Sequence, residues 1–316
     1  MNSYRRGDGD APGEYPAPPG TRNRRTGLDC RTVPRVIDLH THSTCSDGAL
    51  TPAELLARAA TVGLRALALT DHDTTAGLEE AATAARAHRV RLVPGIEFSA
   101  AWRSQSVHVL GLWIDPDAPA LRAAVAAQLD RRRRRIRAIC ERLSHKGLPG
   151  DRLLAMVEAR AALPTRAHLA DALVEAGCVR APRDAFRIHL GRGRAAHVAA
   201  DWPALAEIVG WIVAAGGIAS LAHPTRYTLS ATARNRLLAD FGAAGGRALE
   251  IGCGGNAAHH VDACAALAHR YGLEATVGSD FHGPRMPWNP LGRLAKLPDG
   301  LIPAWRSRGI GGDEDG

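Results

Sequence analysis

Val36-Ile37-Asp38-Leu39-His40-Thr41-His42 is an apolar run that ends in two histidines separated by one residue. In an extended strand, residues i and i+2 project from the same face, so His40 and His42 can converge on one metal ion without a loop to hold them. Asp47 adds a carboxylate on a turn five residues later. Two strand histidines can equally be an ordinary hydrogen-bonded pair, so their interpretation depends on the rest of the chain.

Composition restricts the class of protein. A chain of 316 residues with 46% hydrophobic residues can hold one large α/β domain or two ordinary ones. Six scattered cysteines form no Cys-x-x-Cys pair, which argues against a zinc ribbon and a disulfide framework and fits a reducing cytoplasm. We expect neither a membrane span nor a secretory signal. The net charge of +8 favours an anionic partner such as phosphate or nucleic acid, although solubility explains it equally well.

From Arg35 onward, strand-like runs alternate with helix-like runs, a pattern that predicts parallel strands joined by crossover helices. Residues 1–34 are rich in Gly, Pro, Arg and Asp, and we expect a disordered basic tail there rather than a functional arm. We expect a second disordered tail at 309–316. Seven strands are predicted: Val36–His42, Ala66–Asp71, Arg91–Glu97, Val107–Ile114, Gly217–His223, Ala248–Gly252 and Ala275–Asp280.

A helical insertion is expected between these strands. The strand pattern is lost from 116 to 202, where helical patterns replace it and Gly147 and Gly177 provide helix stops. Elsewhere, Thr51-Pro52-Ala53-Glu54 carries a capping box, with Gly63 available to end that helix. The insertion holds an arginine run, Arg131–Arg135 with Arg137, which we interpret as a solvated helix surface rather than a nucleic-acid patch.

Polar residues gather where the apolar strands end. The carboxyl ends of parallel strands are where β/α barrels assemble their active sites. Three carboxylates and six imidazoles are too many ligands for one ion, so we expect two or three divalent metals that share bridging carboxylates, with Mn²⁺, Fe²⁺ and Zn²⁺ as candidates. Each residue alone has an ordinary structural interpretation, but nine together do not. The nine are His40, His42, Asp47, His72, Glu97, His108, His223, Asp280 and His282. His108 is the exception, because it lies near the start of its strand and would have to come from a neighbouring or antiparallel segment.

Four segments that contain these residues resemble the sequence motifs of the polymerase and histidinol phosphatase (PHP) family. They are His40-x-His42, Thr70-Asp71-His72-Asp73, Leu221-Ala222-His223-Pro224 and Gly278-Ser279-Asp280-Phe281-His282. The resemblance implies a distorted seven-stranded β/α barrel, in two parts at 35–115 and 203–308, with the insertion as a substrate cap. It also implies a trinuclear centre, commonly of manganese. By position, one ion would be held by His40, His42, Glu97 and Asp280, a second by Glu97, His108 and His223, and a third by Asp47, His72 and His282.

Further segments are Arg166-Ala167-His168-Leu169-Ala170, Ala185-Phe186 through Leu190-Gly191-Arg192-Gly193-Arg194, and Ala215-Gly216-Gly217 before the third motif. They resemble those of bacterial nucleoside 3′,5′-bisphosphate phosphatases, some of which also degrade short RNA from the 5′ end. His197 and Ala167 depart from that branch, where we expect Tyr and Pro. The resemblance implies removal of the 3′-phosphate through attack by a hydroxide that bridges two metals. We expect no obligate protein partner. The expected substrate contacts are Arg166, His168, Arg194, His197 and Arg226, and Asp71 and Asp73 would orient imidazoles. A histidinol-phosphate phosphatase and a non-catalytic RNA-binding module remain alternatives.

Overall fold

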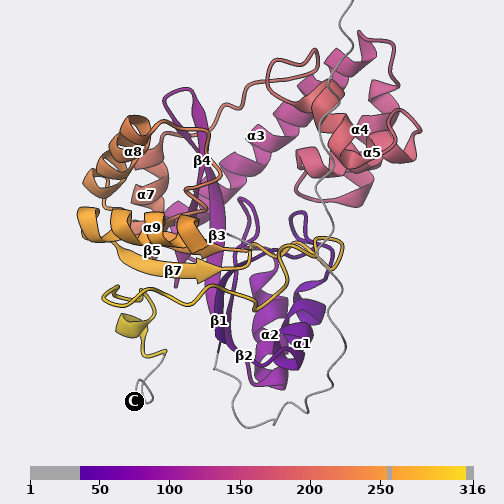
Figure 1. Ribbon diagram of the computed structural model, residues 1–316. Helices are drawn as coiled ribbons and strands as arrows, with labels where there is room; N and C mark the ends of the chain where they lie inside the picture. Colours follow the sequence, from indigo (N-terminus) through magenta and orange to yellow (C-terminus); the bar gives the residue numbers. More distant parts are fainter. Residues whose placement is uncertain (1–35, 255–257, 311–316) are drawn as a thin grey trace, which may run out of the picture. The chain divides into compact units, whose positions relative to one another are not determined.

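All seven expected strands are present in the computed structural model, which describes residues 36–254 and 258–310. They form one sheet in chain order, and an isolated parallel bridge from Thr41 to Phe281 brings the region after the last strand back to the first. The sheet is thereby a nearly closed barrel, as expected (Figure 1). The strands are β1 (Val36–Thr41), β2 (Leu64–Leu69), β3 (Arg91–Trp102), β4 (Gln105–Leu112), β5 (Ile218–Leu221), β6 (Ala248–Cys253) and β7 (Glu274–Gly278). The expected N-terminal tail lies outside the described residues, as does 311–316 of the C-terminal one.

The predicted parallel arrangement does not extend to β4, in line with the position of His108 near the start of its strand. This strand is antiparallel to both β3 and β5, while the other paired neighbours are parallel. The physical reason is the connection: only Arg103 and Ser104 separate β3 from β4, which is enough for a hairpin and too short for a crossover helix. The same hairpin extends β3 five residues beyond Glu97, its expected end. Reversal of β4 also brings its early residue His108 opposite Ser99 of β3.

The barrel helices pack against the sheet. They are α1 (Pro52–Thr61), α2 (Leu78–His88), α7 (Leu205–Ala214), α8 (Ala231–Ala243) and α9 (Ala258–Tyr271). The predicted capping box of α1 is present, because Thr51 accepts from the N–H of Glu54 and the Glu54 carboxylate accepts from the N–H of Thr51. Leucines of α1, α2 and α8 are fully or almost fully buried with side chains of β2, β3 and β4 in one large core. This packing fixes the strand ends on which the site depends.

The predicted helices between 116 and 202 are also present. The long α3 (Pro119–Ser144) is followed by α4 (Gly150–Arg160), α5 (Arg166–Glu175), the single turn α6 (Pro182–Ala185) and a π-helical turn at Phe186–Leu190. Gly147 and Gly177 follow the ends of α3 and α5 with positive φ angles of 79° and 71°, as expected of helix stops. Buried leucines of α3, α4 and α5 form a separate core. No described helix combines the length and the apolar character that crossing a membrane would require.

Candidate metal centre

The nine side chains predicted from the strand ends lie together in the structure. His40 is in β1 and His42 directly follows it, and both Nε2 atoms face the same two carboxylates. The Asp280 Oδ1 atom lies 3.3 Å from His40 Nε2 and 3.2 Å from His42 Nε2. The i, i+2 spacing therefore does direct both imidazoles to one point, as the sequence predicts.

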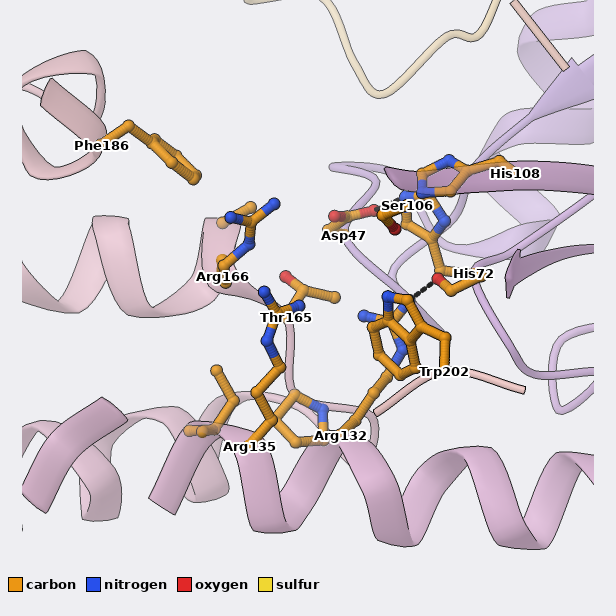
Figure 2. A pocket seen from close by; sticks show the side chains of 14 residues that line it. Asp47, His72, Ser106, His108, Arg132, Arg135, Thr165, Arg166, Phe186 and Trp202 are labelled. Carbon is orange, nitrogen blue, oxygen red and sulfur yellow. Dashed lines mark hydrogen bonds and ion pairs between the residues drawn. The ribbon is translucent and has the colours of Figure 1, made fainter. Parts of the chain in front are cut away.

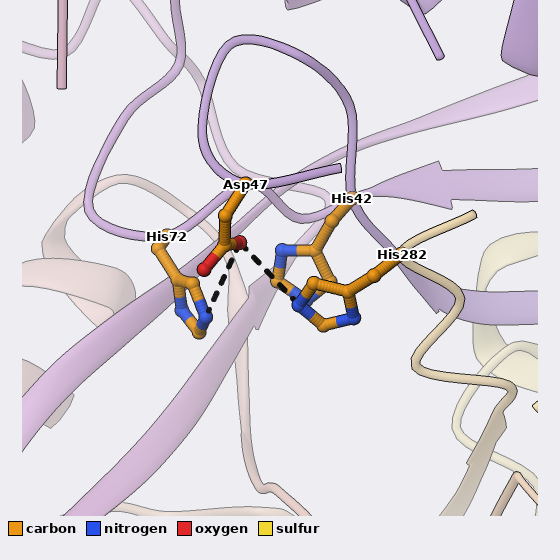
Figure 3. A group of neighbouring side chains, drawn as sticks. All are labelled: His42, Asp47, His72 and His282. Carbon is orange, nitrogen blue, oxygen red and sulfur yellow. Dashed lines mark ion pairs between the residues drawn. The ribbon is translucent and has the colours of Figure 1, made fainter. Parts of the chain in front are cut away.

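Three groups of donors form within this cluster. The first is His40, His42, Glu97 and Asp280; the second is His72, Glu97 and His108; and the third is His42, Asp47, His72 and His282. Figure 3 shows the third group, in which Asp47 lies between His72 and His282, at 3.8 and 3.4 Å from their Nε2 atoms. Each group has ligand atoms close enough to share one cation. The described residues therefore offer places for several metal ions.

Glu97 is the centre of the cluster. Its carboxylate is fully buried and lies 2.8–3.4 Å from nitrogens of five imidazoles, those of His40, His42, His72, His108 and His223. Reversal of β4 is what allows His108 to approach Glu97 from the neighbouring strand. A carboxylate with two oxygens among so many ring nitrogens has the arrangement of a ligand that bridges two ions.

Unpartnered polar atoms test whether these residues fit metal ions. Buried polar atoms almost always have hydrogen-bond partners. Several buried atoms here have none and point into the cluster: His40 Nε2, His42 Nε2, Asp47 Oδ1, His72 Nδ1 and Glu97 Oε2. Divalent cations would satisfy all of them at once, because imidazole nitrogen and carboxylate oxygen are both ligands of first-row metals. The donor set therefore fits the expected centre.

Electrostatics lead to the same conclusion. Burial lowers the pKa of His42, but the neighbouring carboxylates of Asp280 and Glu97 outweigh it and raise that pKa to about 10. Against the same burial penalty, Glu250, Glu97 and Asp280 raise the pKa of His40 well above its usual range. The carboxylates thus require positive charge between them. Protons on the imidazoles supply it in the metal-free chain, and metal ions would replace those protons.

The backbone at two of these residues is strained. His223 has a φ of 31° and Asp280 a φ of 52°, both in the left-handed region that residues other than glycine rarely adopt. Strain of this kind costs about 1–3 kcal/mol and persists where the surroundings fix the conformation, often at functional sites. The nearby Gly278 cannot be replaced by a residue with a side chain, because a Cβ there would lie 2.2 Å from the Cβ of His40. The motif glycine therefore permits β7 to approach the histidine strand.

Glu250 is a member of the site that the sequence analysis missed. It is buried in β6, where its Oε1 lies 2.9 Å from His40 Nδ1 and its Oε2 accepts from the N–H of His223 at 2.6 Å. One carboxylate therefore holds two predicted ligands, one in β1 and the other just after β5. The available signal was an acidic residue within the apolar segment Ala248–Cys253.

The carboxylates of Asp71 and Asp73 accept hydrogen bonds from groups other than the ring of His72. Asp71 accepts from the N–H and hydroxyl of Ser43 and from the hydroxyl of Ser46, which lies 3.4 Å from His42 Nδ1. It can therefore act on an imidazole only through Ser46. Asp73 accepts from Gln128 and Arg132 of α3 and from the N–H of Ser99. Asp73 thus ties α3 to the barrel instead of orienting an imidazole.

The expected substrate contacts divide into two groups. Arg226 pairs with Asp280, and Arg166 lines a pocket next to the cluster. His168 instead caps α5, where its Nδ1 accepts from the N–H of Thr165 at 3.2 Å. Arg194 is exposed, and among the described residues neither it nor His168 lines that pocket. His197 is half-buried near Arg135 and Arg166, whose charges add to burial in lowering its pKa.

The interpretation of the arginine run as a solvated surface is wrong for half of its six members. Arg132 is buried and Arg131 and Arg135 are half-buried, while the other three are exposed. Of the six, only Arg132 and Arg135 line the pocket (Figure 2). Positions three apart share one face of a helix, so Arg132 and Arg135 point the same way. The sequence shows this spacing but not which face of α3 meets the barrel.

The fold and the site define a class of protein: a barrel whose strand ends hold a cluster of side chains that can ligate metal ions. A model of the PHP domain family matches residues 38–214, and the chain belongs to this family.

Proteins of known function resemble it over most of their length. A 3′,5′-nucleoside bisphosphate phosphatase of Chromobacterium violaceum is 41% identical over 272 residues, covering 85% of this chain and 95% of that protein. A 5′-3′ exoribonuclease of Haemophilus influenzae is 39% identical over 270 residues, covering 85% of this chain and 97% of that protein. A solved structure of an amidohydrolase from Chromobacterium violaceum, with bound sulfate and no metal, has a TM-score of 0.80 at 40% identity, covering 86% of this chain and 95% of that chain.

Proposed function

We propose that this chain hydrolyses the 3′-phosphate of nucleoside 3′,5′-bisphosphates, and that it also degrades short RNA in the 5′-to-3′ direction. The observation that carries the proposal is the cluster of nine donors with unpartnered buried atoms beside an arginine-lined pocket. The names of two relatives at about 40% identity support the substrate class. A cytoplasmic location belongs to the same proposal, because six scattered cysteines without a Cys-x-x-Cys pair fit a reducing compartment.

The nine predicted residues would hold two or three metal ions, with manganese as the proposed metal. Imidazole and carboxylate ligands together suit Mn²⁺, and Fe²⁺ and Zn²⁺ are the other candidates. When bound, such ions acidify water and stabilise the negative charge that develops on a phosphoryl group. Three donor groups support three ions, two of which would share Glu97. The groups differ from the expected sets, because His72 rather than His223 joins Glu97 and His108, and His42 joins the third group.

The protein's own residues would position the reacting phosphate. Arg226 lies on the loop after β5. Its guanidinium forms an ion pair with Asp280, which places a fixed positive charge next to the cluster. Guanidinium groups suit this role because they remain charged and match the geometry of phosphate oxygens. The ion pair holds the guanidinium beside this predicted metal ligand, while the Arg226 side chain remains 41% exposed and open to a substrate. We therefore assign Arg226 to the phosphate that is hydrolysed.

Release of inorganic phosphate from adenosine 3′,5′-bisphosphate, on protein with quantified metal, tests this function. We expect activity that EDTA abolishes and Mn²⁺ restores. Asp280→Asn preserves the size of the side chain and should lower kcat/KM by more than about 100-fold, since loss of an outer partner alone costs 10- to 100-fold. His40→Ala should act likewise.

Near-normal turnover in Asp280→Asn with a reduced metal content would overturn the proposed role of the cluster. Histidinol phosphate serves as the comparison substrate, and faster release from it would overturn the substrate assignment. RNA binding that survives EDTA, together with no phosphate release from any substrate, would indicate a non-catalytic module.

A further inference from the structure

The β4–β5 ladder changes at one pair of residues next to the cluster. The two strands pair regularly up to Val109 and Leu221. One residue further, the N–H of Ala222 donates to the carbonyl of His108 at 3.1 Å, as an antiparallel ladder requires. The reciprocal bond runs through a side chain: the hydroxyl of Tyr227 accepts from the N–H of His108 at 2.8 Å and donates to the carbonyl of Ala222 at 3.0 Å. This hydroxyl is therefore inserted into the ladder.

Tyr227 reaches this pair because the chain turns at His223. That residue has a φ of 31°, and its carbonyl accepts from the N–H of Arg226 at 3.0 Å, which closes the turn. The Tyr227 side chain is half-buried against the large core. Its ring meets the ring of His223 at an angle of 66°, with the centroids 5.5 Å apart. One tyrosine therefore contacts β4, the end of β5 and a predicted metal ligand.

The two segments that the hydroxyl joins carry imidazoles of the cluster. His108 Nδ1 lies 2.9 Å from Glu97 Oε1, and His223 Nε2 lies 3.0 Å from the same oxygen. A direct bond would place the His108 nitrogen about 2.9 Å from the oxygen of Ala222. Two bonds in series, of 2.8 and 3.0 Å, hold these atoms further apart. The hydroxyl therefore sets the spacing of β4 and β5 where both imidazoles meet Glu97.

We propose that Tyr227 is a positioning residue whose hydroxyl acts as a spacer in the β4–β5 ladder and holds His108 and His223 at the separation that a shared metal ion requires. This inference rests on the proposed function and deepens it, because it names a residue that assembles the metal centre without binding a metal. Without the hydroxyl, the backbone groups of His108 and Ala222 would lose a partner or bond directly to each other. Either change would move the imidazole of His108 relative to Glu97.

Titration of the EDTA-treated full chain with Mn²⁺ tests this role without a substrate. Tyr227→Phe keeps the ring and its packing against the core, so the variant should fold, but it removes both hydrogen bonds of the hydroxyl. We expect the affinity for the Mn²⁺ ion held by Glu97 and His108 to fall by about 10- to 100-fold, the usual effect of losing an outer partner of a metal ligand. The ion held by Asp47 and His282 should bind as in the wild type. Identical titrations of variant and wild type would overturn the inference.

Ser220→Ala is the matched control. Ser220 is buried in β5, and its hydroxyl lies 2.7 Å from that of Thr276 in β7. Each variant therefore removes one hydrogen-bonded hydroxyl from the barrel, and both should lower the midpoint of denaturation by urea. Only Tyr227→Phe should weaken the binding of Mn²⁺. Equal weakening in the two variants would indicate a general loss of stability and would overturn the positioning role.

A double-mutant cycle with His108→Ala shows whether the tyrosine acts through this histidine. Tyr227→Phe should weaken Mn²⁺ binding less in the His108→Ala chain than in the wild-type chain, because one imidazole that the hydroxyl positions is absent. Effects of the two substitutions that simply add would overturn the inference.

Release of phosphate from adenosine 3′,5′-bisphosphate separates this inference from the proposed function. The activity of Tyr227→Phe should recover when Mn²⁺ is raised by the factor that is lost in affinity, and a loss that no concentration restores would overturn the positioning role. No release by the wild-type chain would contradict the proposed function, while the titrations with Mn²⁺ still decide the role of Tyr227.

Discussion

Glu250→Gln is the substitution that most directly tests how the site is held. The Glu250 carboxylate accepts from His40 Nδ1 at 2.9 Å and from the N–H of His223 at 2.6 Å, and it is buried. An acceptor on Nδ1 selects the His40 tautomer whose Nε2 lone pair faces the cluster. Glutamine has nearly the same shape, but its amide carries no charge and can turn an N–H toward the imidazole. The variant should therefore fold while losing the preference for that tautomer.

The expected size of the effect follows from these contacts. A hydrogen bond to a charged group contributes about 1.5–3 kcal/mol, which corresponds to roughly 10- to 150-fold in an equilibrium constant. Loss of an outer partner of a metal ligand typically costs 10- to 100-fold in metal affinity. We therefore expect the affinity for Mn²⁺ to fall by about 10- to 100-fold in Glu250→Gln, measured by titration of the metal-free protein. The activity should recover when Mn²⁺ is raised by the same factor.

A matched control is available on the neighbouring strand. Glu274 of β7 is half-buried and pairs with Arg247, away from the cluster, so Glu274→Gln should leave the affinity for Mn²⁺ unchanged. Equal metal affinity in Glu250→Gln and wild type would refute the positioning role of this carboxylate. Loss of activity that no concentration of Mn²⁺ restores would refute it too, because it would place Glu250 in the reaction itself.

Two further predictions concern stability and pH. Arg132→Ala leaves the buried carboxylate of Asp73 without its cation and should lower the free energy of unfolding by about 3–5 kcal/mol. Denaturant titration measures this free energy. Arg137→Ala is the control and should change it by only about 0–1 kcal/mol, because Arg137 pairs with Glu158 at the exposed surface. Equal losses of stability in the two variants would contradict the reasoning. In the metal-free chain, the raised pKa of His42 stabilises the fold below about pH 6.5, and this stabilisation is lost as the pH rises through about 10. Metal binding should therefore release protons, and the affinity for metal should increase as the pH rises between these two values. Calorimetry in buffers of different ionisation enthalpy measures the released protons. Detection of none would exclude this coupling.

The sequence alone determined the barrel and most of the candidate site. Apolar runs with polar residues at their ends marked all seven strands, because buried strands must be apolar while their carboxyl ends can meet a ligand. The i, i+2 spacing of His40 and His42 placed both on one face for the same geometric reason. The capping box of α1 was also readable, since it depends only on residues that are three apart.

Contacts between distant segments were decided only by the tertiary structure. The reversal of β4 follows from a two-residue connection, yet its consequence, the contact of His108 with Glu97, depends on strand pairing. Glu250 looked like any acid in a strand until β6 brought it to His40. The arginine run was interpreted as one solvated surface, because the spacing of Arg132 and Arg135 puts them on one side of α3 but does not say which side faces the barrel. Local sequence determines which face a side chain occupies, whereas what lies opposite that face is determined by packing over hundreds of residues.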